Sequence, residues 1–194
     1  GGGAGGKRLP VNVCLVIDRS GSMLETTPSG LTRWTALTRA MERVLPVVDR
    51  DLWMGLLQYP EPPLASTAAC VVTPSVPLPP RAFNTTPMLT AVRATQPVGG
   101  TPTFDALSAA ARYFANNPQP TRVRGRYIVL ATDGQANFCV TCNPLCDLNA
   151  DATLFVQQIR DAAQIDGIRT FVIGVPGSEG FRAVLSQLAD DLAG

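Results

Sequence analysis

The chain has 194 residues, of which 45% are hydrophobic, and its formal net charge is +1. These values are typical of one α/β domain with a buried core, and a second domain is not expected at this length. Because the 16 basic and 15 acidic residues are spread evenly, the sequence has no basic stripe that could follow a phosphate backbone. Nucleic acid is therefore not an expected partner.

The residue inventory excludes several kinds of active site. Histidine is absent, which rules out imidazole general bases, Ser/His/Asp triads and imidazole metal ligands. The only lysine is Lys7, ahead of the first expected strand, so a phosphate-binding loop with a lysine is excluded as well. An active site would have to use carboxylates, hydroxyls and thiols.

The first eight residues, GGGAGGKR, are typical of a flexible linker and lack the apolar core of a secretion signal. We expect a linker over residues 1–8 and a single domain over residues 9–194. No apolar run approaches the roughly 20 residues that span a bilayer. We therefore expect no membrane insertion by this segment, and a monomeric domain taken from a larger protein.

The first half of the chain predicts strands and one long helix. Residues 11–17 form an apolar run with four β-branched residues, typical of a buried strand, and the polar turn DRSGS follows. Apolar residues at helical spacing predict a helix that begins after Thr32 as N-cap and has Pro46 near its end. Strands are expected over residues 52–59 and 70–73, lying side by side.

The second half alternates between helices and strands. The Pro-rich residues 74–86 are expected to form a loop, and residues 87–95 a short helix with Pro87 in its first turn. The turn VGGTPT opens a helix that runs to about residue 115, and the strand over residues 126–132 ends in the polar turn Asp133-Gly134. The remaining elements are a helix at 149–164, a strand at 168–175 and a final helix at 180–192.

This alternation predicts a doubly wound, mostly parallel sheet with helices on both faces and one antiparallel edge strand. In such sheets ligands bind beyond the carboxyl ends of the strands, where the loops converge. Asp18 and Asp133 each follow a buried strand, so both are expected at that edge. Right-handed crossovers make the two preceding strands close neighbours in the sheet.

Three loops offer hard oxygen ligands at this edge. The first loop contributes the pattern D-x-S-x-S, the second contributes a threonine after a double glycine, and the third contributes an aspartate. The expected ligand positions are Asp18, Ser20, Ser22, Thr101 and Asp133. Hydroxyls and carboxylates without histidine select a hard cation such as Mg²⁺, which prefers octahedral oxygen coordination. The glycines let the backbone bend around an ion and let the threonine loop approach it.

The phrases VCLVIDRSGSM, GGTPTFDAL and IVLATDGQANFC resemble the von Willebrand factor A domains, above all bacterial secreted or surface members. The resemblance covers nearly the whole chain and implies a Rossmann-like fold. It also implies the family's metal-ion-dependent adhesion site. In that site Ser20, Ser22 and Thr101 would supply direct or water-bridged hydroxyl ligands, and Asp18 and Asp133 would act largely through water.

The resemblance and charge counting together predict a recognition module and not an enzyme. A dication held chiefly by neutral hydroxyls stays electron-poor and keeps an open coordination position. An exposed Asp or Glu of a protein partner can fill that position. We expect one divalent cation, with Mg²⁺ first and Mn²⁺ and Ca²⁺ as alternatives.

Two other functions compete with this prediction. The same fold serves as an intracellular regulatory subunit of chelatases and related ATPase machines. A metal-dependent phosphohydrolase could use Asp18 as its nucleophile, since carboxylate-nucleophile phosphatases also begin with an Asp after the first strand. That chemistry wants a second carboxylate two residues later, where this chain has Ser20, and a lysine for the phosphate.

The five cysteines are of two kinds. Cys14 lies on a core strand and is expected to be a small buried hydrophobe. The other four are Cys70, Cys139, Cys142 and Cys146, the last three in the pattern C-x-x-C-x-x-x-C. They are interpreted either as a zinc site or as two disulfides with three pairings open. We favour the disulfides, which predicts an extracytoplasmic location: secreted, periplasmic or at the cell surface.

Three further charged residues lie near these loops. Glu25 is expected to be a solvated loop residue rather than a contact of the ion. Asp105 is expected to be favoured by the dipole of the helix that it opens. Arg19 points away from the ligands by alternation and is either a solvated rim residue or a reader of a partner carboxylate.

Overall fold

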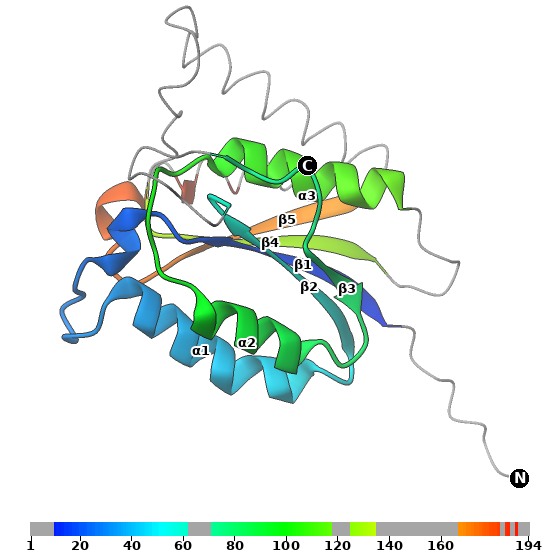
Figure 1. Ribbon diagram of the computed structural model, residues 1–194, viewed down its shortest axis with the longest axis horizontal. Helices are drawn as coiled ribbons and strands as arrows, with labels where there is room; N and C mark the ends of the chain where they lie inside the picture. Colours follow the sequence, from blue (N-terminus) through cyan, green and yellow to red (C-terminus); the bar gives the residue numbers. More distant parts are fainter. Residues whose placement is uncertain are drawn as a thin grey trace, which may run out of the picture.

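The computed structural model describes residues 10–61, 71–117, 125–134 and 167–182, with residues 185, 186 and 189. In these ranges five strands form one sheet: β1 Val11–Asp18, β2 Leu52–Tyr59, β3 Leu78–Arg81, β4 Arg126–Thr132 and β5 Ile168–Gly174. Their order is β3-β2-β1-β4-β5, and only the pairing of β2 with β3 is antiparallel (Figure 1). The predicted mostly parallel sheet with one antiparallel edge strand is confirmed.

The edge strand lies later in the chain than the sequence pattern predicted. Residues 71–73 are outside any strand, and β3 falls in the segment that was predicted to be loop. Two of its four residues, Pro79 and Pro80, cannot donate to a ladder, which restricts such a segment to a sheet edge. The prediction was wrong because β3 has no alternating pattern and is fixed by pairing with β2.

Two helices cover one face of the sheet, α1 Arg33–Val48 and α2 Thr85–Ala94 (Figure 1). Thr32 caps α1 as predicted, because its hydroxyl oxygen accepts a hydrogen bond from Thr35 N at 3.1 Å. Helix α2 begins two residues earlier than expected, so that Pro87 still lies in its first turn. The opposite face is covered by α3 Thr103–Asn116.

Alternation along the strands divides the core into two layers. Cys14 and Val16 of β1 pack with α3, whereas Ile17 packs with α1 and α2. The α3 layer includes Leu57, Ala106, Leu107, Ala110, Phe114, Ile128 and Leu130. The layer under α1 and α2 includes Trp34, Leu37, Met41, Leu45, Met54, Met88 and Val92. Because both faces of β1 are buried, this strand is a nearly continuous apolar run.

Several sequence predictions fall on other parts of the chain. The linker over residues 1–8 and the helix at 149–164 lie outside the described residues. At the expected final helix, the short 3-10 helix η2 Glu179–Phe181 is followed by helical residues 182, 185, 186 and 189. No helix in the described ranges is long and apolar enough to cross a membrane.

Candidate metal centre

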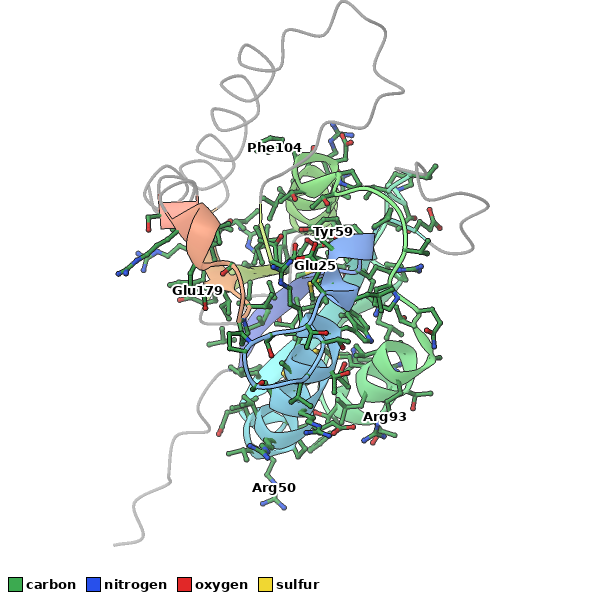
Figure 2. The ribbon with its side chains drawn as sticks, turned by 90° about the vertical axis from the view of Figure 1, so that its left-hand side faces the viewer. Glu25, Arg50, Tyr59, Arg93, Phe104 and Glu179 are labelled. Atoms are coloured by element: carbon green, nitrogen blue, oxygen red, sulfur yellow. The ribbon has the colours of Figure 1, made fainter. Side chains whose placement is uncertain are left out.

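The polar turns that follow β1 and β4 meet at one edge of the sheet. These two strands are parallel neighbours, with Ile17 opposite Ala131, so Asp18 and Asp133 both leave the sheet on the same side. The short 3-10 helix η1 Gly21–Leu24 forms the turn after β1. Figure 2 views the molecule from this side, with Glu25 of this turn and Glu179 of η2 labelled. The predicted neighbourhood of the two aspartate loops is confirmed.

Asp18 forms the buried base of the site and has no exposed surface. Its Oδ1 accepts a hydrogen bond from Ser20 N at 2.8 Å, and its Oδ2 accepts one from the Thr132 hydroxyl at 2.7 Å. Burial raises the pKa of Asp18 to about 6, although the hydrogen bonds from Thr132 and Ser20 lower it and Asp133 raises it slightly. A cation placed nearby would offset the cost of burying this carboxylate.

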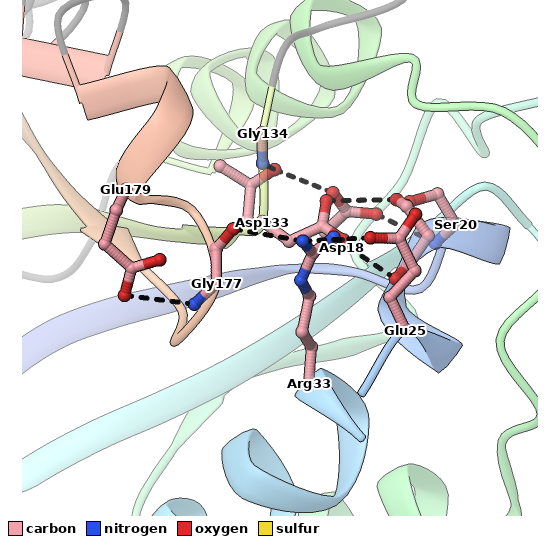
Figure 3. A network of polar contacts seen from close by, with 10 residues as sticks. Asp18, Ser20, Glu25, Arg33, Asp133, Gly134, Gly177 and Glu179 are labelled. Carbon is pink, nitrogen blue, oxygen red and sulfur yellow. Dashed lines mark hydrogen bonds and ion pairs between the residues drawn. The ribbon is translucent and has the colours of Figure 1, made fainter. Parts of the chain in front are cut away.

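The side chains of Ser20 and Asp133 lie close to Asp18 (Figure 3). The hydroxyls of Ser20 and Ser22 are 3.0 Å apart, and the Ser22 hydroxyl donates to Asp133 Oδ1 at 3.0 Å. Adjacent oxygens of an octahedron with metal–oxygen distances of about 2.1 Å are separated by about 3.0 Å. The separations of Ser22 from Ser20 and from Asp133 therefore fit neighbouring ligands of one small dication.

The threonine loop is fixed to the first loop through the backbone. Gly21 N donates to Gly99 O at 3.0 Å, and Val98 N donates to Arg19 O at 2.8 Å. Gly99 has a φ of +97°, which favours glycine. Thr101 follows Gly99 by two residues, so these bonds keep it near the first loop. Its side chain is buried. The roles of the five predicted residues as metal ligands remain a proposal.

The proposed donor set consists of hydroxyl and carboxylate oxygens. Among the described residues no three His, Cys, Asp or Glu side chains come together as a metal cluster. Serine hydroxyls and a carboxylate oxygen are ligands of hard cations, and they leave a dication electron-poor. The chemistry of this donor set fits Mg²⁺ or Mn²⁺ better than a soft metal.

Three residues of the site were missed at the sequence level. Thr132 is the last residue of β4, and its position directly before Asp133 could have indicated a polar role. Tyr59 at the end of β2 is buried, and its hydroxyl lies 3.2 Å from the Thr103 hydroxyl; burial and the nearby Asp18 raise its pKa. Arg33, at the start of α1, contacts Asp133 Oδ2 at 2.8 Å, and no local pattern indicated this.

The other charged candidates are placed as follows. Arg19 is only 3% exposed and donates to Gln96 O at 3.0 Å, so the interpretation as a solvated rim residue was wrong. Its guanidinium contacts the backbone at Gln96, just before the threonine loop. Alternation of side chains alone could not predict this contact. Glu25 is solvated as expected, with 63% exposure, and it pairs with Arg33. Asp105 is in the first turn of α3, where partial burial raises its pKa.

The cysteine predictions are tested only in part. Cys14 is completely buried, as expected, and burial raises the pKa of its thiol to about 12. The four cysteines of the proposed disulfides or zinc site, Cys70, Cys139, Cys142 and Cys146, lie outside the described residues. Their pairing stays a prediction.

Comparison with known families decides the class of the domain. Residues 13–135 match the profile of the von Willebrand factor type A domain, and this span is more than half of the chain. The chain belongs to the von Willebrand factor type A family. The matched span of this VWA domain includes all five predicted ligand positions. A search of curated proteins finds no match.

Solved structures with the same fold come from varied sources. BatB from Bacteroides thetaiotaomicron, a conserved hypothetical protein, is 22% identical with a TM-score of 0.57, over 84% of this chain and 66% of its own. The pilus adhesin SpaC from Lactobacillus rhamnosus GG is 16% identical with a TM-score of 0.65, over 95% of this chain and 27% of its own. Manganese-loaded TRAP from Plasmodium vivax is 18% identical with a TM-score of 0.59, over 94% and 63%.

These similarities show the VWA fold of the chain. The chain spans less than two thirds of the length of each of these solved structures.

Proposed function

We propose that this VWA domain is a cation-dependent protein recognition module. It would present one divalent ion, Mg²⁺ first, with an open coordination position for an Asp or Glu of a protein partner. The observation that carries the proposal is the position of the Ser22 hydroxyl, 3.0 Å from the Ser20 hydroxyl and 3.0 Å from Asp133 Oδ1. The bound ion would act as a Lewis acid toward the partner carboxylate.

The proposed ligands have different tasks. Ser20 and Ser22 would bind the ion through their hydroxyls, with Thr101 completing the set from the second loop. Asp133 would act from the third loop, and Asp18 would fix Ser20 through the hydrogen bond to its backbone N–H. Because most of these ligands are neutral, the ion would keep most of its positive charge for the partner.

An enzymatic role has less support. A nucleophilic Asp18 would need an accessible oxygen, but Asp18 is fully buried and both of its oxygens accept hydrogen bonds. The sequence has no histidine to serve as a general base. We therefore propose a non-enzymatic domain.

The solved relatives support a location outside the cytoplasm. They include the pilus adhesin SpaC. The manganese in the TRAP structure supports the proposal of a divalent cation. We propose that residues 9–194 form a single extracytoplasmic domain of a larger protein. Disulfides among the four cysteines beyond Cys14 would support this location, and four free thiols in protein purified without reductant would favour the intracellular regulatory role.

The metal proposal is tested by thermal unfolding after treatment with a chelator. Millimolar Mg²⁺ or Mn²⁺ should raise the melting temperature of the wild type, because an ion that binds only the folded state stabilises it. The Asp133→Asn variant should lose most of this rise. Asp51→Asn, which changes an exposed acid in the turn between α1 and β2, should keep it. No rise in the wild type, or an equal rise in both variants, contradicts the proposal.

A second measurement locates the ion. Crystals soaked in Mn²⁺ should give an anomalous-scattering peak between the Ser20 and Ser22 hydroxyls. A peak elsewhere on the domain, with these hydroxyls still bonded to each other, would overturn the assignment of the ligands.

A further inference from the structure

Arg33 lies directly beside the proposed metal ligands, although it begins a helix on one face of the sheet. Its guanidinium is bonded on several sides (Figure 3). Nη1 donates to Asp133 Oδ2 at 2.8 Å and contacts Ser22 O at 3.4 Å, while Nη2 donates to Gly177 O and Glu25 Oε2, both at 3.0 Å. The side chain is only 12% exposed, so this position is built into the fold.

The turn after β5 is shaped to hold this guanidinium. Gly177 has a φ of +95°, and a Cβ atom at this residue would lie 2.7 Å from Arg33 Nε. A side chain at position 177 would therefore push the arginine out of its place. The close contact between backbone and guanidinium shows that Arg33 is a structural part of the site and not a freely moving surface residue.

The two carboxylate oxygens of Asp133 have different partners, one on the side of the proposed ion and the other Arg33. Its Oδ1 accepts the Ser22 hydroxyl, and its Oδ2 accepts Arg33. A guanidinium group carries a positive charge. This charge lies beside Asp133 Oδ2, the oxygen that does not contact Ser22. Glu25 offsets this charge only weakly, because its side chain is 63% exposed and its field is screened by water.

We propose that Arg33 is a built-in cation that shares Asp133 with the metal and lowers the affinity of the site for a divalent ion. This inference rests on the proposed metal site. Without an ion, Arg33 neutralises Asp133, which is only 3% exposed. With an ion bound, the same charge repels the dication and leaves it less tightly held.

Two effects of Arg33 oppose each other, and the repulsion outweighs the orientation. The guanidinium helps to orient Asp133, but the Ser22 hydroxyl still orients Oδ1 when the arginine is removed. Repulsion between a single and a double positive charge separated by one carboxylate is large in a site of low dielectric. Removal of the charge should therefore tighten binding of the ion by at least about tenfold.

The test measures Mn²⁺ binding by electron paramagnetic resonance of the free ion. Arg33→Gln removes the charge and should lower the Kd for Mn²⁺ at least about tenfold. Arg33→Lys keeps the charge and should stay within about threefold of the wild type. Arg93→Gln, the matched control, changes an exposed arginine that pairs with Glu42 on the surface of α1 and α2, and should have no effect.

Thermal unfolding measures the same effect by a second method, because the stabilisation by an ion depends on its Kd. Without an ion, Arg33→Gln should melt at a lower temperature than the wild type, because Asp133 is left buried and unpaired. Saturating Mn²⁺ should then raise its melting temperature by more than it raises that of the wild type. A variant that stays unfolded even at millimolar Mn²⁺ would overturn the inference, because the ion would fail to replace the guanidinium.

The outcomes separate this inference from the metal proposal. Equal or weaker Mn²⁺ binding by a folded Arg33→Gln variant, with normal binding by the wild type, overturns the role of Arg33 alone. Tighter binding by Arg33→Lys equal to that of Arg33→Gln would also overturn it, since charge would not be the cause. Absence of Mn²⁺ binding in every variant overturns both proposals.

Discussion

Ser22 and Asp133 are 111 positions apart in the chain, yet the hydroxyl of Ser22 donates a 3.0 Å hydrogen bond to Asp133 Oδ1. This contact joins the turn after β1 to the turn after β4. It brings these two turns together because β1 and β4 are paired in the sheet, so the candidate site depends on that pairing.

Replacement of Ser22 tests the contribution of a single hydroxyl. Ser22→Ala should weaken Mn²⁺ binding by about 10-fold to 100-fold, because one proposed ligand and the orientation of Asp133 are lost together. Ser29→Ala, in the exposed loop that follows, is the matched control and should bind Mn²⁺ like the wild type. Isothermal titration calorimetry measures both affinities. Equal affinities would remove Ser22 from the set of ligands.

Thr132 should contribute to stability through Asp18. Thr132→Val keeps the shape of the side chain but removes the donor that lies 2.7 Å from Asp18 Oδ2 in the buried base of the site. An unsatisfied buried carboxylate oxygen costs about 1–3 kcal/mol, so the free energy of unfolding in urea should fall by that amount. Thr90→Val, which removes an exposed hydroxyl that donates to Thr86 O in its own helix, should change it little. Similar losses in both variants would contradict this role.

Gly55 tests the packing of the edge strand. A Cβ atom at this position would lie 2.7 Å from Leu78 O and 2.7 Å from Pro80 N, both backbone atoms of β3. Gly55→Ala should therefore destabilise the domain by about 1–3 kcal/mol in urea unfolding. Gly180→Ala, where nothing lies within 4 Å, should be tolerated. A fully stable Gly55→Ala variant would mean that β3 does not pair with β2 as described.

Cys14 should be chemically inert in the folded protein. Its thiol is completely buried, and burial raises its pKa to about 12, so almost no thiolate forms at pH 8. Iodoacetamide should leave the peptide that contains Cys14 unmodified in the native protein and should alkylate it fully after unfolding in guanidinium. Mass spectrometry resolves this peptide from those of the other cysteines. Rapid native alkylation would disprove the burial of Cys14 in the core.

Local patterns were sufficient for the main strands and helices. The apolar runs of β1 and β4 end where the polar turns begin, and Thr32 marks the start of α1, because burial on both faces and capping are read from adjacent residues. The five proposed ligand positions, from Asp18 to Asp133, could be named for the same reason, because each loop follows a strand end or contains a double glycine. The sequence by itself thus determined the main strands and helices and named the residues of the proposed metal site.

Only the tertiary structure decided which side chains from distant segments meet. Arg33 reaches Asp133 across 100 positions, and β3 becomes a strand through pairing with β2, so neither leaves a periodic signal in its own neighbourhood. Arg19 is buried, and its guanidinium donates to Gln96 O, 77 positions away in the chain. Such contacts depend on how the crossovers fold back onto the sheet, and a local stretch of sequence does not contain that information.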